Sequence, residues 1–323
     1  MRVLTASLTL LCACGPGPTL VPPTVVDDAA LPRLSIRVAG RDRLIHVRTM
    51  GDPSAPPVLV MHGSLADARY LLMLEPLAAT HFVVLWDQRG NGLSERLDSA
   101  SEYTADAIVE EIDAVAEHFA QGRRFTLVGH SFGGMFAALY TSRRPERVER
   151  LALMEPGGLN GDVFGPTYSA IIHIDLLAPG LNSMFWQNEV LSPSTHERLD
   201  LRALMMLSGE QTPGYLCDPR RPPDFPVWRP GGHVDLLRSL LLQGKAAPGK
   251  FDYDFAAGLA TFPRPVTVIA GSCSSIGPDY QRTWHLPLLP PGTSIITIEG
   301  AGHRFPVERP AETVEALRTF LSK

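Results

Sequence analysis

The sequence predicts an α/β fold, in which a mostly parallel, doubly wound sheet carries a helical lid as an insertion. Short apolar runs, typical of strands buried on both faces, alternate with segments of helical periodicity. This alternation stops over residues 157–263 and then resumes. The 323 residues, 45% of them hydrophobic and 20% charged, suffice for one large or two closely joined globular domains.

The first 33 residues read as an export and tethering segment. Residues 1–14 carry Arg2, a short apolar run and the sequence Leu-Cys-Ala-Cys, which resembles a bacterial lipobox whose last cysteine, Cys14, is lipidated. The apolar run is too short to span a bilayer, which needs roughly 20 residues. Residues 15–33 are rich in proline and indicate a solvated tether. We expect a membrane-anchored lipoprotein of the bacterial cell envelope; the alternative is a plain cleaved signal and a periplasmic or secreted protein.

The first part of the predicted core spans residues 34–156. Residues 34–38 and 44–48 alternate apolar with polar side chains, as an antiparallel pair does, whereas the later strands are continuously apolar. Those later strands are predicted over residues 58–61, 82–86, 125–128 and 148–154. Helices are predicted over 66–74, from the N-cap Thr104 to Gly122, and over 132–144 before Pro145.

Residues 157–263 form the predicted lid, with helical pieces at 168–177, 196–207 and 234–243. The core resumes over residues 264–323. Its predicted elements are a strand at 266–270, a helix at 278–285, a strand at 294–298 and a closing helix with Pro310 in its first turn.

Residues 129–133, Gly-His-Ser-Phe-Gly, follow the apolar run 125–128 and open a helical segment. In a strand, sharp turn and helix, Gly-x-Ser-x-Gly is the nucleophile elbow, because the glycines allow the tight reversal that exposes the serine oxygen. The pattern predicts Ser131 as a nucleophile.

Two further motifs fit the same chemistry. His-Gly-Ser at residues 62–64 follows the third strand, where the backbone N–H of Ser64 and that of Phe132 can form an oxyanion hole. His303 follows two glycines in the loop after the last strand, from which an imidazole can act as general base for Ser131. Asp87 and Arg89 are expected to anchor their loop.

From about residue 34 onward, the chain resembles the α/β-hydrolase family. Residues 86–94 are similar to the Trp-Asp-Gln-Arg-Gly segment of its proline iminopeptidase branch, and residues 300–303 to the histidine loop. Two motifs depart from that branch: it has His-Gly-Gly-Pro-Gly where residues 62–66 read His-Gly-Ser-Leu-Ala, and Gly-Gly-Ser-Trp-Gly at the elbow. The elbow is closer to the esterase and lipase-like form.

The resemblance also locates the acid of the triad. In this family a carboxylate usually follows the strand at 266–270, but Ser274 stands there. Some members, notably haloalkane dehalogenases, use an acid just after the preceding strand, where this chain has Glu155. Glu155 is therefore the predicted acid, and Asp279 the alternative.

The resulting expectation is a serine hydrolase, a carboxylic ester hydrolase above all, that cleaves a small acyl ester, thioester or amide through an acyl-enzyme. One alternative is an iminopeptidase-like aminopeptidase, for which Glu189 and Glu210 are candidate amine ligands. Another is a catalytically inactive binding lipoprotein. No metal or cofactor is expected, and the net charge of -5 without a basic stripe argues against nucleic acid. Outside the cytoplasm, Cys217 and Cys273 could form a disulfide, or could remain unrelated thiols.

Overall fold

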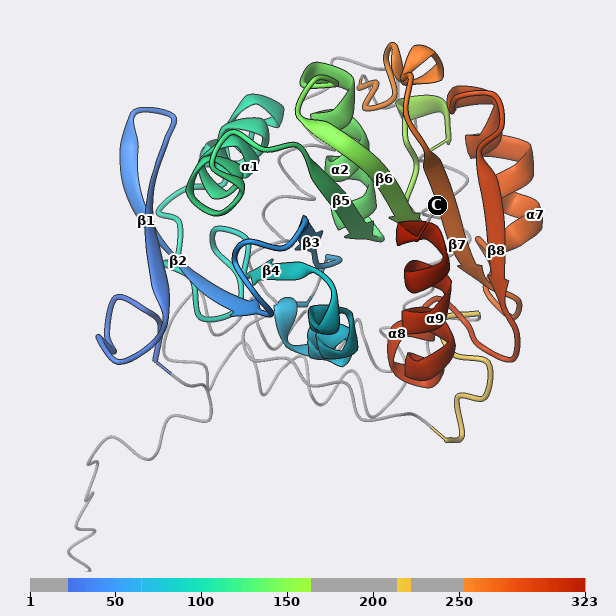
Figure 1. Cartoon of the computed structure of the whole chain (residues 1–323), viewed down its shortest axis with the longest axis horizontal. Coiled ribbons are helices and arrows are strands. Elements are labelled where there is room, and N and C mark those ends of the chain that lie inside the picture. Colours follow the sequence, from blue (N-terminus) through green and yellow to red (C-terminus); the bar gives the residue numbers. More distant parts are fainter. Residues whose placement is uncertain (1–22, 65, 164–213, 222–252, 323) are drawn as a thin grey trace, which may run out of the picture.

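The computed structural model describes residues 23–64, 66–163, 214–221 and 253–322, and their eight strands form one sheet in the order β1-β2-β4-β3-β5-β6-β7-β8 (Figure 1). β2 pairs antiparallel with β1 and β4, and every later pairing is parallel. The sheet therefore begins antiparallel and becomes parallel, as the sequence predicts. The strands are β1 (Arg33–Val38), β2 (Arg41–Met50), β3 (Pro57–Met61), β4 (Phe82–Trp86), β5 (Phe125–His130), β6 (Val148–Met154), β7 (Val266–Gly271) and β8 (Ser294–Ile298).

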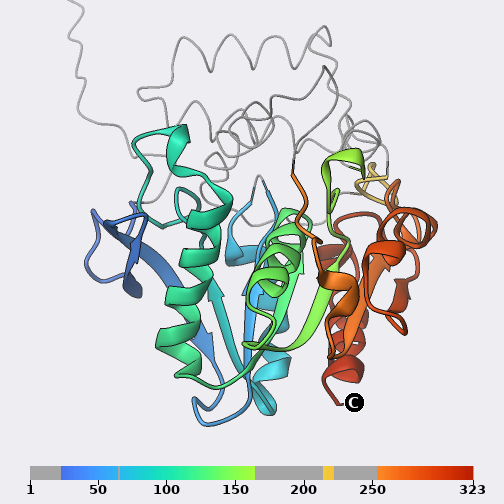
Figure 2. The ribbon, with the colours of Figure 1, turned by 90° about the horizontal axis from the view of Figure 1, so that it is seen from above.

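Helical segments cover both faces of this sheet. α1 and α2 pack on one face with side chains of β5 and β6, while η1 and α9 pack on the other (Figure 2). The described helical segments are η1 (Ala68–Ala79), η2 (Ala100–Glu102), α1 (Ala105–Ala120), α2 (Phe132–Arg143), η4 (Leu259–Thr261), α7 (Pro278–Tyr280), η5 (Gln281–His285), η6 (Leu286–Leu288), α8 (Phe305–Glu308) and α9 (Pro310–Leu321).

The local signals of the sequence explain where α1 begins and ends. The Thr104 side chain accepts a hydrogen bond from the backbone N–H of Ala107 at 3.1 Å, which caps the first turn as predicted. Gln121 has a left-handed backbone (φ 51°) and Gly122 follows it with φ 79°. A glycine just past the last turn is a common helix ending, because it adopts this conformation without steric cost.

Two predicted helices differ from the structure. The segment predicted at 66–74 is a 3₁₀ helix, η1, and Pro76 inside it has no N–H to donate and disfavours continuous α-helix. The helix predicted at 278–285 is only one α-turn, α7, followed by a π-turn and a 3₁₀ turn that contains Pro287. The three predicted lid helices lie outside the described residues. Within the described ranges, no helix is both long and apolar enough to cross a bilayer.

The parallel strands all end at one edge of the sheet. The loops after β3, β5, β6 and β8 begin with His62, Ser131, Glu155 and the segment that holds His303. In open α/β sheets, ligands bind outside the carboxyl ends of the strands. The topology therefore gathers the predicted functional residues at the edge where a ligand is expected.

Candidate active site

Ser131 lies in a sharp turn between β5 and α2, with φ 55° and ψ -118°. Such a backbone conformation costs a non-glycine residue about 1–3 kcal/mol and persists only where the surroundings enforce it. The turn also requires its glycines: a Cβ on Gly129 would lie 2.1 Å from the Gly133 carbonyl oxygen, and one on Gly133 would lie 2.5 Å from the carbonyl oxygens of Met61 and His62. The structure therefore has the sharp strand–turn–helix geometry that the sequence predicts for residues 129–133.

Glu155 lies at the end of β6 and contacts the predicted general base. Its Oε2 is 2.5 Å from Nδ1 of His303, and both side chains are buried. The other carboxylate oxygen, Oε1, accepts the backbone N–H of Gly271 at 2.8 Å, and Oε2 also accepts the Ser274 hydroxyl at 2.8 Å. Glu155 itself has φ 44°, so a second strained residue lies beside the elbow.

The alternative acid lies elsewhere. The Asp279 side chain is 99% exposed at the start of α7 and pairs with Arg282 at 2.6 Å. No hydrogen bond joins it to His303, and both residues belong to the described part of the chain. The structure therefore brings Glu155, and not Asp279, to the histidine.

Burial acts on both members of this pair. It raises the pKa of Glu155, while the hydrogen bonds from Ser274 and Gly271 lower that pKa and favour the carboxylate. Burial also lowers the pKa of His303, and the positive charge of Arg304 lowers it further. His303 is therefore neutral at neutral pH, and a neutral imidazole is the form that can accept a proton from a serine hydroxyl.

The elbow and the histidine loop are held together through His130, the residue before Ser131. The rings of His130 and His303 stack with centroids 4.9 Å apart, and Nε2 of His130 bonds to the His303 carbonyl oxygen at 3.0 Å. No hydrogen bond joins the Ser131 hydroxyl to the His303 imidazole, although the structure describes both. Bonds of this kind often tighten only when substrate binds.

The predicted oxyanion loop lies against the elbow. A Cβ on Gly63 would be 3.1 Å from Cβ of Ser131, so Ser64 follows a residue in close contact with the nucleophile. Phe132 is the first residue of α2, and the N-terminus of a helix favours negative charge. Phe132 thus directly follows Ser131, and Ser64 follows a residue that lies against it.

The loop after β4 is hydrogen-bonded to the start of the loop after β3. Gln88 donates its side-chain N–H to the His62 carbonyl oxygen at 2.7 Å, and its backbone N–H bonds to Nε2 of His62 at 3.0 Å. Asp87 accepts the backbone N–H groups of Ala68 and Leu93, each at 2.8 Å. Asp87 therefore anchors its loop, as expected from the sequence.

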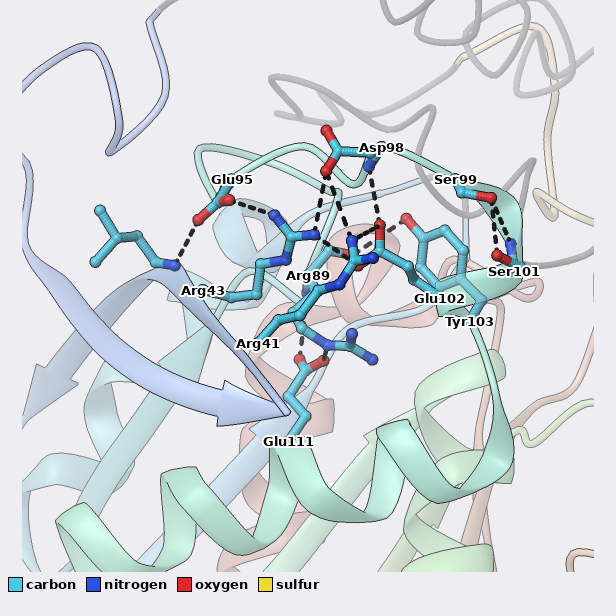
Figure 3. Close-up of polar contacts among 11 residues, drawn as sticks. Arg41, Arg43, Arg89, Glu95, Asp98, Ser99, Ser101, Glu102, Tyr103 and Glu111 are labelled. Atoms are coloured by element: carbon cyan, nitrogen blue, oxygen red, sulfur yellow. Dashed lines mark hydrogen bonds and ion pairs between the residues drawn. The ribbon is translucent and has the colours of Figure 1, made fainter. Parts of the chain in front are cut away.

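Ion pairs, one of them buried, hold the outer part of the same loop. Figure 3 shows Arg43, from β2, bonded to Glu95 and Glu102, each at 2.6 Å. Arg89 donates to Glu111 of α1 at 2.7 Å, and both side chains are almost fully buried. Breaking a buried pair of this kind leaves an uncompensated charge and costs about 3–5 kcal/mol. Arg89 is therefore an anchor as well.

A described piece of the lid region, residues 214–221, is fixed to the histidine loop. The backbone N–H of His303 donates to the Gly214 carbonyl oxygen at 3.0 Å, and the Tyr215 ring lies 5.2 Å from the His303 ring. Cys217 and Cys273 form a disulfide with Cα atoms 5.1 Å apart. Of the two possibilities left open by the sequence, the structure has the disulfide.

The sequence does not identify three residues at this site as functional. Ser274 stands where the family usually has its acid, and only the structure shows that its hydroxyl holds a carboxylate from the neighbouring strand. Tyr70 and His130 carry no motif signal of their own, because their contacts join segments 60 residues apart. The candidate ligands Glu189 and Glu210 and the lipidation residue Cys14 lie outside the described residues. In the described part, no three His, Cys, Asp or Glu side chains gather as a metal site would require.

Comparisons with known proteins agree on the fold. Rhodomycin D methylesterase DauP of Streptomyces sp. (strain C5) is 28% identical over 273 residues, which cover 80% of this chain and 88% of the relative. A mouse serine hydrolase-like protein is 35% identical over 112 residues, 34% of this chain and 36% of that protein. This chain spans 33–55% of the length of that protein and of three further curated relatives.

Among solved structures, a membrane phospholipase A described as a bacterial virulence factor superposes with a TM-score of 0.62. It is 23% identical and the match covers 91% of this chain and 86% of that chain, so the likeness shows the fold. The family model for the alpha/beta hydrolase fold matches residues 56–310, which include the elbow, Glu155 and His303. This chain belongs to the alpha/beta hydrolase fold family.

Proposed function

We propose that this protein is a serine hydrolase that cleaves a small acyl ester, thioester or amide through an acyl-enzyme. One observation carries the proposal: a buried carboxylate, Glu155, contacts Nδ1 of a buried histidine whose loop is bonded to the residue before an elbow serine. A nucleophile, a base and a group that orients the base are the parts that acyl transfer requires. The similarity to a methylesterase along four-fifths of the chain supports an ester as substrate.

Each residue has a role in the proposed reaction. Ser131 Oγ attacks the acyl carbon while Nε2 of His303 takes its proton, and Glu155 stabilises the resulting imidazolium. The negative charge that forms on the carbonyl oxygen is held by backbone N–H groups of Ser64 and Phe132. His303 then gives its proton to the leaving group, and a water activated by His303 releases the acid from Ser131. No metal or cofactor takes part in these steps.

A panel of p-nitrophenyl esters of graded chain length, with an aminoacyl anilide alongside, tests this proposal. We expect ester turnover that falls by at least about 10³-fold in Ser131→Ala, the usual scale for loss of such a nucleophile. Ser142→Ala is the matched control, because Ser142 lies on the same helix with its hydroxyl bonded to the Ala257 carbonyl oxygen. Its turnover should equal that of the wild type.

Two outcomes would favour the other functions. Turnover of the anilide in preference to the esters would indicate an aminopeptidase, which the similarity of residues 86–94 to the proline iminopeptidase branch makes the second candidate. No turnover of any acyl substrate by the wild type would favour a binding lipoprotein. The proposed location is the bacterial cell envelope, with lipid on Cys14.

A further inference from the structure

A chain of hydrogen bonds connects the oxyanion loop to the histidine loop by a route that does not include the triad. The backbone N–H of Gly63 bonds to the Tyr70 hydroxyl at 2.9 Å, and that hydroxyl lies 2.7 Å from Nδ1 of His130. Nε2 of His130 lies 3.0 Å from the His303 carbonyl oxygen. These contacts join the loop after β3, the 3₁₀ helix η1, the end of β5 and the loop after β8.

The chemistry of the groups fixes the direction of each bond. A carbonyl oxygen only accepts, so Nε2 of His130 carries a hydrogen and donates it to His303. The other nitrogen of the neutral ring, Nδ1, then accepts, and the donor to it is the Tyr70 hydroxyl. The Tyr70 oxygen in turn accepts the Gly63 N–H. The bonds of Gly63 and of His130 Nδ1 therefore require a hydroxyl at position 70, and the two bonds of His130 fit a neutral imidazole.

Packing holds the His130 ring in the orientation that these bonds need. It stacks on His303 at 4.9 Å, and the edges or faces of Phe305 and Tyr70 meet it at centroid distances of 5.7 and 5.5 Å. All four side chains are buried. Leaving a buried polar group without its hydrogen-bond partner costs about 1–3 kcal/mol of stability. Moving the loops after β3 and β8 away from the end of β5 would therefore cost a free energy of about that size.

The positions of the two ends of this chain matter to the proposed reaction. Gly63 precedes Ser64, whose N–H is a proposed oxyanion donor. An ideal Cβ built on Gly63 would lie 3.1 Å from Cβ of Ser131. His303 is the proposed base. A displacement of about 1 Å in either group can lower a rate about 100-fold. Fixing both ends to the residue before the nucleophile therefore sets the geometry of oxyanion donor, nucleophile and base together.

We propose that Tyr70 and His130 are positioning residues that hold the oxyanion loop and the catalytic histidine in register with Ser131. Neither touches the reacting atoms. This inference rests on the proposed serine hydrolase function. It adds that the oxyanion loop and the histidine loop are both held by hydrogen bonds through Tyr70 and His130. Loss of the Tyr70 hydroxyl should therefore reduce stabilisation of the transition state more than it reduces substrate binding.

The test compares Tyr70→Phe with Tyr140→Phe on the best p-nitrophenyl ester. Tyr140 is a matched control, since it is also a buried tyrosine whose hydroxyl makes a side-chain bond, to Asp113 at 2.8 Å, but it lies on the far part of α2. We expect Tyr70→Phe to lower kcat and kcat/KM together by about 10- to 100-fold with KM nearly unchanged, the pattern of an interaction that acts in the transition state. Tyr140→Phe should keep wild-type kcat at a comparable loss of thermal stability.

Two substitutions of His130 separate its bond to the Tyr70 hydroxyl from its bond to the His303 carbonyl oxygen. In His130→Gln the amide can reach the place of Nε2 and still donate to the His303 carbonyl, whereas in His130→Asn the amide lies near the place of Nδ1 and can still accept from Tyr70. We expect each to keep more activity than His130→Phe, which removes both bonds. Adding Tyr70→Phe should lower the rate of His130→Gln by less than it lowers the rate of the wild type, because the bond between Tyr70 and residue 130 is already lost and only the Gly63 bond remains to be removed. The same addition should lower the rate of His130→Asn by about as much as it lowers that of the wild type.

The outcomes distinguish this inference from the proposed function. If the wild type turns over no acyl substrate, or Ser131→Ala retains activity, the proposed function fails. If Ser131→Ala is inactive but Tyr70→Phe has the same kcat as Tyr140→Phe, the function stands and the inference is overturned. A loss in Tyr70→Phe that appears only in KM, or that adds fully to the loss in His130→Gln, also overturns it.

Discussion

The Ser274 hydroxyl donates a 2.8 Å hydrogen bond to the Glu155 carboxylate oxygen that lies 2.5 Å from Nδ1 of His303. Ser274 stands where the family usually has its acid. The loop after β7 thus supplies a donor to the acid instead of the acid itself, while the carboxylate comes from the end of β6. In this chain the loop after β6 supplies the carboxylate that contacts His303, and the loop after β7 supplies the hydroxyl that holds it.

Neutralising Glu155 should disable the proposed triad. In Glu155→Gln we expect kcat on the ester to fall by about 10³- to 10⁴-fold with the fold intact, because an amide no longer favours the productive state of His303. Asp279→Asn, the control with the same chemical change on an exposed carboxylate, should keep wild-type kcat. Collapse in Asp279→Asn with an unchanged Glu155→Gln would transfer the role to Asp279.

A second substitution strengthens this comparison. Ser274→Asp in the Glu155→Gln background places a carboxylate at the usual position of the acid, and part of the lost kcat should return. In the wild-type background the same change sets two carboxylates side by side, which raises the pKa of one of them, so it should lower activity. Failure to recover any rate in the double variant would indicate that Glu155 does not act as the triad acid.

The pH profile should report the burial of Glu155. Because burial raises its pKa, kcat/KM should fall on the acid side at a pH above the 4.5 of an ordinary carboxyl group. The Ser274 bond lowers that pKa, so Ser274→Ala should raise it and move the acid limb to higher pH. The check is kcat/KM against pH for both proteins, and a limb that stays in place or moves to lower pH in Ser274→Ala contradicts the assignment.

The Cys217–Cys273 bond should stabilise both the fold and the site. It closes a loop with a sequence separation of 56, and a bond of this kind contributes about 2–4 kcal/mol. The double variant Cys217→Ser/Cys273→Ser should therefore unfold at lower denaturant concentration, and its kcat should fall because residues 214–217 support the His303 backbone. Intact-mass analysis of the unreduced protein should show a mass two hydrogens lighter than after reduction. Alkylation of both Cys217 and Cys273 before reduction would refute the bond.

Cys14 should carry the lipid anchor in a native-like host. A single acyl chain binds a membrane only marginally, so stable anchoring needs the several chains of a bacterial lipoprotein. Metabolic labelling with a palmitate analogue should mark the wild type and leave Cys14→Ser unmarked. An unmarked wild type that is found in the soluble fraction would indicate a cleaved signal instead.

The sequence predicts the sheet well, because strands buried on both faces give continuous apolar runs. Predicted and observed limits of β4, β6 and β8 coincide. It is less successful where backbone chemistry competes with periodicity: residues 66–74 have an apolar pattern compatible with an α-helix, yet Pro76 lies within the 3₁₀ segment that forms. The helix predicted at 278–285 also differs, because a π-turn follows the single α-turn and Pro287 lies in the 3₁₀ turn after that.

At the candidate site, motif and strand order locate Ser131, His303 and Glu155, because loops after parallel strands meet at one edge. They do not locate Tyr70 or Ser274. A tyrosine on an apolar helical face has the pattern of a core residue, and only the fold shows that its hydroxyl meets Gly63 and His130. Contacts between distant segments leave no periodic trace in the sequence.

The most direct test of the central claim is the mass of the adduct formed with a fluorophosphonate, which reacts with an activated serine. The account predicts one phosphonyl group per chain, located by peptide mass spectrometry on Ser131, and none in Ser131→Ala under the same conditions. An unlabelled wild type with demonstrated ester turnover, or an adduct on another residue that persists in Ser131→Ala, would contradict it.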